Sequence, residues 1–157
     1  MLKYYNERVI IMKNKILLIV LILIVILLAS IYWVYNYRTN ALESQKINKQ
    51  FQSYYDTQML GTELISVINK TEDVNTKYGV EKDEQGLFIE NDINSIKVYV
   101  NFKYKDEYRL LEIEKILNNG IENFIKTYST ASFKCTEITY HEKTGNVKTL
   151  VFEETDD

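Results

Sequence analysis

The chain has 157 residues, a length typical of one globular domain with an appendage. Residues 38–157 carry 15 basic and 21 acidic side chains, a net charge of −6, and such an acidic surface does not attract nucleic-acid phosphates. The only cysteine is Cys135 and the only histidine is His141, which excludes an intrachain disulfide and disfavours a zinc site of the usual His/Cys type.

A long apolar run follows the first basic residues. Residues 16–28 are thirteen consecutive Ile, Leu or Val, and no charged side chain occurs from residue 16 to residue 35. Twenty helical residues span ~30 Å, the thickness of a bilayer's hydrocarbon core. Thirteen such side chains favour insertion by roughly −4 to −8 kcal/mol. We therefore predict a basic cytoplasmic stub at residues 1–15 and a transmembrane helix at residues 16–37.

A cleaved signal peptide is the alternative interpretation of this run. The apolar stretch is long for a signal peptide, and Leu27 stands where cleavage after Ala29 would need a small residue. This pattern favours an uncleaved signal-anchor that stays in the membrane.

Basic residues predict the orientation of this helix. Lys3, Arg8, Lys13 and Lys15 precede the run, whereas Arg38 is the first basic residue after it. Basic flanks stay in the cytoplasm, so we expect a single-pass protein of the cell membrane with a cytoplasmic N-terminus and an extracytoplasmic C-terminal domain. The aromatic residues at 32, 33, 35 and 37 are typical of a membrane–water interface, here the one on the extracytoplasmic side of the bilayer.

Residues 38–59 read as a helical extension or linker with a weak apolar stripe. Leu60, Leu64, Val67 and Ile68 then follow the spacing of an amphipathic helix, which Thr62 is placed to cap. The sequence leaves two alternatives open: one helix of about 55 residues, or a helix that breaks near Gly61.

Beyond residue 75 the apolar period changes from helix to strand. Residues 79–91 read as a hairpin with its turn at Asp83–Gly86, and residues 95–104 alternate as a half-buried strand. We expect a strand at about 108–116 and a short helix at about 120–128. Residues 132–154 form the clearest hairpin, with Gly145 in its turn and a bulge near Thr136–Glu137.

These elements predict an α+β fold: an N-terminal transmembrane helix that extends into a small antiparallel sheet domain packed on a helix, with residues 60–157 as the extracytoplasmic domain. No catalytic, cofactor-binding or metal-binding residue is assigned, and no cofactor is expected. Cys135 is interpreted as a buried apolar residue and His141 as a solvated turn residue. The Asp-rich and Gly-containing stretches match neither a calcium loop nor a phosphate loop.

The plan of basic stub, apolar helix and antiparallel sheet resembles that of type IV pilins and pseudopilins. The pilin Gly before the apolar run and the Glu at its fifth position have no counterpart around Ile16. The stretches "LGTELISVINK", "KDEQGLFIEN" and "SFKCTEITYHEKTGNVKTLVFEE" also resemble small uncharacterised membrane-anchored proteins of clostridia-type bacteria. The first resemblance implies a subunit whose apolar helices bundle inside a filament.

We accordingly expect a non-enzymatic cell-envelope protein that acts through protein–protein contacts. Its partners would be the lipid bilayer and either unidentified envelope proteins of a secretion or pilus-like assembly, or further copies joined through the apolar helix. The alternative is a membrane-anchored sensor of a small ligand or a carboxylate-dependent enzyme, whose chemistry would depend on acidic residues with Tyr or Cys135 in a cleft.

Overall fold

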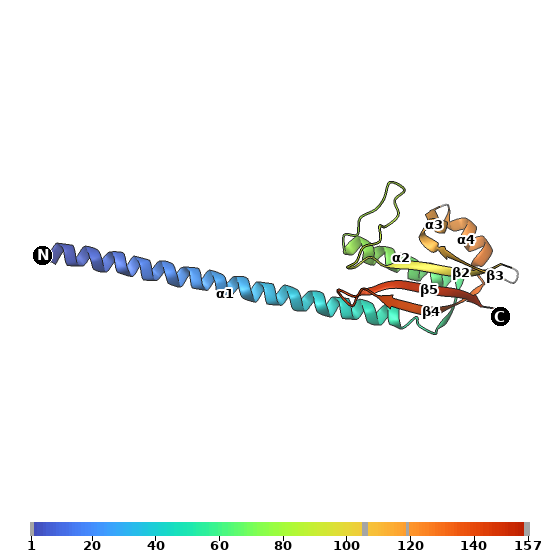
Figure 1. Cartoon of the computed structure of the whole chain (residues 1–157), viewed down its shortest axis with the longest axis horizontal. Coiled ribbons are helices and arrows are strands. Elements are labelled where there is room, and N and C mark those ends of the chain that lie inside the picture. Colours follow the sequence, from blue (N-terminus) through green and yellow to red (C-terminus); the bar gives the residue numbers. More distant parts are fainter. Residues whose placement is uncertain (1, 105–106, 119, 156–157) are drawn as a thin grey trace. The chain divides into compact units, whose positions relative to one another are not determined.

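The computed structural model describes residues 2–104, 107–118 and 120–155, with side chains from residue 13 onward. Its class is α+β, as predicted: a long apolar helix, a five-stranded sheet and three shorter helices (Figure 1). The chain divides into two compact units, residues 1–44 and residues 45–157, and each is described by itself. The side chains of Lys3 and Arg8 in the predicted basic stub lie outside the described residues.

Helix α1, Leu2–Gln52, forms the first unit up to residue 44, and its last turns, from residue 45 onward, belong to the second unit. This stretch contains no Gly or Pro, so nothing in it interrupts the backbone hydrogen bonds. Two of its hydroxyl groups donate to the carbonyl one turn back, Ser30 to Ile26 at 2.8 Å and Thr39 to Tyr35 at 2.9 Å. The helix therefore satisfies its own polar groups along the apolar run.

The second unit is built on a sheet with strand order β1-β4-β5-β2-β3. The strands are β1 (Gln58–Leu60), β2 (Lys97–Tyr104), β3 (Glu107–Glu112), β4 (Ser132–Tyr140) and β5 (Val147–Thr155). The sheet is mixed rather than wholly antiparallel, because β2 and β5 pair in parallel. These two strands are joined through β3, two helices and β4, so no hairpin turn fixes their relative direction.

The C-terminal hairpin matches the prediction closely. Strands β4 and β5 pair antiparallel, and the register shifts between Cys135 and Glu137, where the bulge was expected. Gly145 has φ +69°, a conformation that suits glycine in the turn. The shift keeps Cys135 opposite Phe152 and Ile138 opposite Leu150, so the apolar side chains on both sides of the bulge face the core.

Two other predictions are only partly correct. The turn at Asp83–Gly86 forms, but its flanks share a single bridge, Lys82 with Phe88, and build no strand. Strand β3 ends at Glu112, and helix α3 (Ile113–Asn118) takes the rest of the stretch predicted as strand. Helix α4 (Ile121–Tyr128) agrees with the helix predicted there.

Helix α2 (Gly61–Lys77) starts after a break in the chain, the second of the two alternatives. The break begins at residue 53, because the chain turns after α1 and forms β1 before α2 starts. The N-cap is Leu60 and not Thr62, and the backbone N–H of Leu60 donates to the Glu63 carboxylate at 2.9 Å. A Cβ at Gly61 would lie 1.9 Å from the carbonyl oxygen of Tyr128, so this close approach requires glycine.

One face of the sheet is packed against the core, and the other is only partly covered. Along β2, Val98, Val100 and Phe102 are buried, whereas Tyr99 and Asn101 between them are half-buried. The core joins the end of α1, α2, α4 and the sheet, and its fully buried residues include Phe51, Leu64, Ile68, Val100, Phe133, Leu150 and Phe152. An aromatic cluster lies among them, made of Phe102, Phe124, Tyr128 and Phe133.

Candidate functional site

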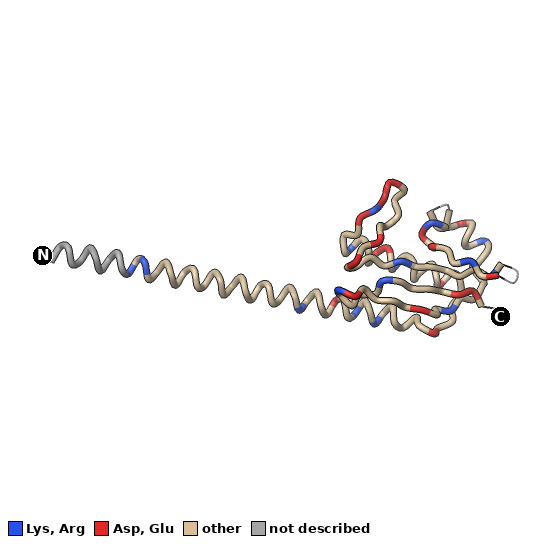
Figure 2. The backbone as a smooth tube through the Cα atoms, in the orientation of Figure 1, with Lys and Arg blue, Asp and Glu red and all other residues tan. Residues whose placement is uncertain are grey.

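The most extended exposed apolar surface in the described part of the chain lies on α1. Every apolar side chain from Ile16 to Tyr37 is exposed. No charged residue interrupts this run (Figure 2). By length and composition, Lys13–Gln52 is the one helix of the described residues that is able to cross a membrane. A helix that is apolar on all sides is unfavourable in water, because its whole apolar surface would contact the solvent.

The aromatic residues predicted to lie at the membrane boundary occur at the end of this run. The rings of Trp33 and Tyr37 stack one turn apart, with centroids 6.1 Å apart and planes inclined by 21°. Both rings are about 70% exposed, as are Tyr32 and Tyr35. Amphipathic rings of this kind favour the boundary between lipid and water, because one end is apolar and the other forms hydrogen bonds.

The last turns of α1 are held to the sheet by Asn48. Its Nδ2 donates to the Gly145 carbonyl oxygen at 2.7 Å, and its Oδ1 accepts from the Val147 N–H at 3.0 Å. The side-chain amide of Asn48 thus donates one hydrogen bond to the backbone of the turn and accepts one from it, as the backbone of a neighbouring strand does. Ile47 and Phe51 flank Asn48 and are buried in the core. Residues 45–52 are therefore fixed to the β4–β5 turn.

His141 is not the solvated turn residue that was expected. It is only 3% exposed, and its Nε2 lies 2.8 Å from the Ser95 carbonyl oxygen. Neighbouring contacts join the same two segments: the Thr144 hydroxyl donates to the Ile93 carbonyl oxygen at 2.6 Å. The prediction failed because the segment 91–95 covers the turn, and this contact between distant parts of the chain leaves no periodic pattern.

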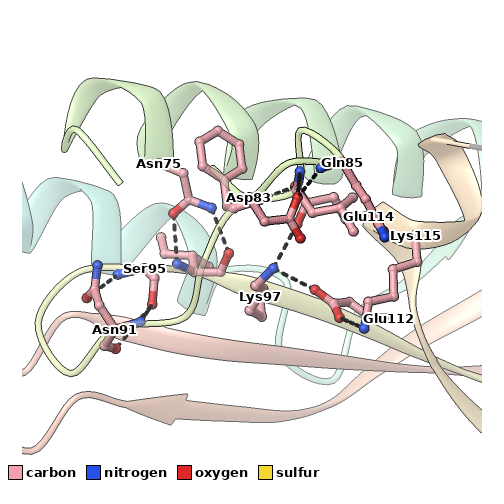
Figure 3. A network of polar contacts seen from close by, with 12 residues as sticks. Asn75, Asp83, Gln85, Asn91, Ser95, Lys97, Glu112, Glu114 and Lys115 are labelled. Atoms are coloured by element: carbon pink, nitrogen blue, oxygen red, sulfur yellow. Dashed lines mark hydrogen bonds and ion pairs between the residues drawn. The ribbon is translucent and has the colours of Figure 1, made fainter. Parts of the chain in front are cut away.

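The segment 91–95 is itself ordered by Asn91. The side-chain Oδ1 of Asn91 accepts backbone N–H groups from Ile93, Asn94 and Ser95 at 2.9–3.2 Å. On the other side, Asn75 of α2 brackets the backbone of Ile96, accepting its N–H and donating to its carbonyl oxygen, both at 2.8 Å. The two asparagines lead the chain from α2 into β2 (Figure 3).

Several ionisable side chains gather around Lys97 at the start of β2 (Figure 3). Lys97 is 7% exposed, and its Nζ lies 2.6 Å from Glu112 and 2.9 Å from Glu114. Glu112 also binds Lys115 at 2.9 Å, and Glu114 accepts the backbone N–H of Phe88 at 2.8 Å. Sequence alternation placed Lys97 on the polar side of its strand and gave no sign of this network.

The electrostatics of this cluster are those of a closed ion-pair network. Burial alone lowers the pKa of Lys97, but its hydrogen bonds to Glu112 and Glu114 outweigh burial and raise the pKa. Burial likewise tends to raise the pKa of Glu112, but Lys97 and Lys115 lower it. These opposing shifts keep Lys97 and Glu112 charged at neutral pH and bonded to each other, an arrangement that stabilises a fold.

Cys135 is the buried apolar residue that was expected. Its side chain is fully buried, and its Sγ lies 3.7 Å from the Glu137 carbonyl oxygen. Burial raises the pKa of the thiol to about 11, so the reactive thiolate is scarce at neutral pH. This cysteine therefore serves packing at the bulge.

A shallow groove of about 480 Å³ lies between the end of β3 and helices α3 and α4. Its apolar walls come from Leu111, Ile116, Phe124 and Tyr128. The two oppositely charged side chains at this groove, Glu112 and Lys115, are bonded to each other. Within residues 13–104, 107–118 and 120–155, no three His, Cys, Asp or Glu side chains converge where a metal ion would be held.

Comparison with known protein families, curated proteins and solved structures finds no match to this chain. Its function therefore has to be argued from its own residues and their arrangement.

Proposed function

We propose that this chain is a single-pass membrane protein whose sheet domain acts through contacts with other proteins and not through catalysis. The observation that carries the proposal is the uninterrupted exposed apolar surface of α1 from Ile16 to Tyr37. Lipid is the environment that offers such a surface favourable contacts on every side, and about 20 residues is the length that a bilayer requires.

The sheet domain supports the second half of the proposal. Its most buried ionisable cluster, around Lys97, is closed by ion pairs and by a backbone hydrogen bond. Its thiol is buried, and its histidine contacts a backbone carbonyl oxygen inside the fold. These groups stabilise the domain, so the surfaces that remain for function are its exposed edges and grooves. Binding between proteins depends on such surfaces.

A fractionation experiment tests the membrane half. Cells producing the full chain are broken, and the membranes are washed with alkaline carbonate, which removes peripheral proteins. We expect the intact chain in the washed pellet, with an N-terminal sequence that continues through residues 16–37. Recovery in the supernatant, or a mature chain that starts after this run, would contradict the proposal.

The orientation is tested with two cysteine variants and a maleimide that does not cross membranes. Glu142 in the β4–β5 turn and Lys15 before the apolar run are both exposed, so Glu142→Cys and Lys15→Cys should both fold. We expect labelling of Glu142→Cys on intact cells, and of Lys15→Cys only after permeabilisation. The native chain, whose thiol is buried, is the unlabelled control. The reverse labelling pattern would show that the domain is cytoplasmic.

A further inference from the structure

Strand β3 is the longer of the two edge strands of the sheet, and it exposes apolar side chains. Tyr108 is 48% exposed, Leu110 57% and Leu111 45%. Its pairing with β2 runs over six residues without a register shift, so no bulge twists this edge away. The chain also contains no proline that would block it. Edge strands of soluble domains usually carry such protection, because an open edge pairs readily with another strand.

The backbone groups available at this edge follow from the pairing. The N–H of Lys103 donates to the Glu154 carboxylate on β5, so the odd-numbered residues of β2 direct their backbone groups toward β5. The even-numbered residues Val100 and Phe102 then face β3, where they pair with Leu111 and Arg109. Backbone groups alternate in direction along a strand, so the N–H and C=O groups of 108, 110 and 112 point outward.

We propose that β3 pairs antiparallel with β3 of a second copy of this chain, with Leu110 opposite the partner's Leu110. The two five-stranded sheets would then join into one continuous sheet. A register centred on Leu110 places the outward groups of 108, 110 and 112 against the same groups of the partner, which gives about six hydrogen bonds. This is strand addition with a second copy as the added strand.

The charges of β3 select this register. The alternative register with comparable overlap is centred on Arg109 and would place two guanidinium groups directly opposite each other. In the register centred on Leu110, Tyr108 lies opposite the partner's Glu112, and Arg109 lies opposite the partner's Leu111, so no like charges face each other. Both carboxylate oxygens of Glu112 are already held by Lys97 and Lys115, so its charge is compensated before pairing.

The groove beside β3 gives the partner strand room. Leu111 forms part of its wall, together with Ile116 and Phe124. In the proposed register the partner's Arg109 lies opposite Leu111, so the apolar stem of that arginine can lie along this wall while its charged end stays at the open edge. Arg109 is already turned over the Tyr104 ring, 4.7 Å from its centroid, which holds its charge beside the strand.

The inference rests on the proposed function in one respect. Copies anchored in a common bilayer are confined to one plane, which raises their effective concentration for pairing. The self-pairing of short edges is weak in dilute solution, so the experiment is done with the full chain in its membrane.

The test uses single cysteines on the full chain, where Cys135 stays buried and unreactive. In the proposed register the two Cα atoms at position 110 lie ~5.5 Å apart, within the range that a disulfide spans. We expect Leu110→Cys to give mainly covalent dimers when membranes are mildly oxidised. Leu60→Cys on the opposite edge strand should stay at the level of the native chain. Leu60 is similarly exposed, so it is a matched control for random collision.

Each other outcome overturns the inference. Dimers of Leu110→Cys no more abundant than those of Leu60→Cys would show that β3 does not pair with itself. Leu110 is exposed, so Leu110→Lys should fold. It should raise the dissociation constant of the dimer at least tenfold, measured by energy transfer between labelled full-length chains in lipid vesicles, whereas Leu60→Lys should not. Carbonate extraction of the same membranes reports separately on the anchor.

Discussion

The apolar run of α1 and the core of the sheet domain use the same residue types in opposite ways. From Ile16 to Leu28 every side chain is exposed, whereas Leu64, Ile68 and Val100 in the second unit are almost completely buried. In the domain, apolar side chains of the sheet pack against those of the end of α1, α2 and α4. The apolar side chains of residues 16–28 pack against no other segment of the described residues. This difference supports the proposal that the first unit contacts an apolar environment, whereas the second unit packs on itself.

The largest expected effect comes from placing charges in the apolar run of α1. Replacing Leu21 and Val25 with arginine puts two charges near the middle of the apolar run. Each costs about 2.5–3.5 kcal/mol at the centre of a bilayer, so the pair cancels most of the insertion free energy of the run. We expect the variant to be lost from carbonate-washed membranes. Leu21→Ala with Val25→Ala keeps the run uncharged and should remain in the pellet.

The next largest effect is expected from truncating a buried side chain in the core of the domain. Phe133 is fully buried within the aromatic cluster, so Phe133→Ala leaves a cavity and should lower the free energy of unfolding of the domain by about 3–5 kcal/mol. Ile22→Ala removes a similar apolar group from the exposed helix and should leave the domain unchanged. Urea unfolding of the detergent-solubilised chain, followed by circular dichroism, measures both. Equal losses would mean that the helix and the domain unfold together.

The sequence predicted whatever depends on local pattern. The apolar run, the β4–β5 hairpin with its bulge, and the turn at Asp83–Gly86 all follow from residue types close together in the chain. The parallel pairing of β2 with β5 does not, since periodicity records which side of a strand is apolar and not its neighbour. The burial of His141 and Lys97 was missed for the same reason, because each is buried by a segment distant in sequence.

The two units also differ in charge. The apolar run of α1 contains no charged residue, whereas the domain buries the charge of Lys97. Lys97→Met keeps the stem of the side chain but leaves Glu112 and Glu114 without their shared partner. Removing one member of a buried pair costs about 3–5 kcal/mol, and we expect the lower end because the carboxylates are partly exposed and Lys115 still binds Glu112. Urea unfolding measures the loss. Adding Glu112→Gln and Glu114→Gln should recover part of it, since the unpaired charges are then removed.

The same cluster predicts how stability varies with pH. The pKa of Glu112 is lowered in the folded chain, because Lys97 and Lys115 outweigh the opposing effect of burial. A lowered pKa contributes stability that is present above the ordinary glutamate value, roughly 4.3, and is lost as the pH falls through the folded value. The urea midpoint should therefore fall between pH 5 and pH 3. Glu112→Gln should flatten this fall, whereas Glu142→Gln, at an exposed turn position, should not.

The smallest effect concerns the place where α1 meets the domain core. Asn48 bonds to Gly145 and Val147 on the exposed side of the turn, so Asn48→Ala should lower the free energy of unfolding by only about 1–2 kcal/mol. Its local effect should be larger, because the amides of residues 145–147 would lose their link to the helix. Hydrogen exchange is expected to speed up there and to stay unchanged at β2. Asn101→Ala, on the partly covered face of β2, is the matched control. Unchanged exchange at Val147 would show that Phe51 and Ile47 alone hold the end of the helix in place.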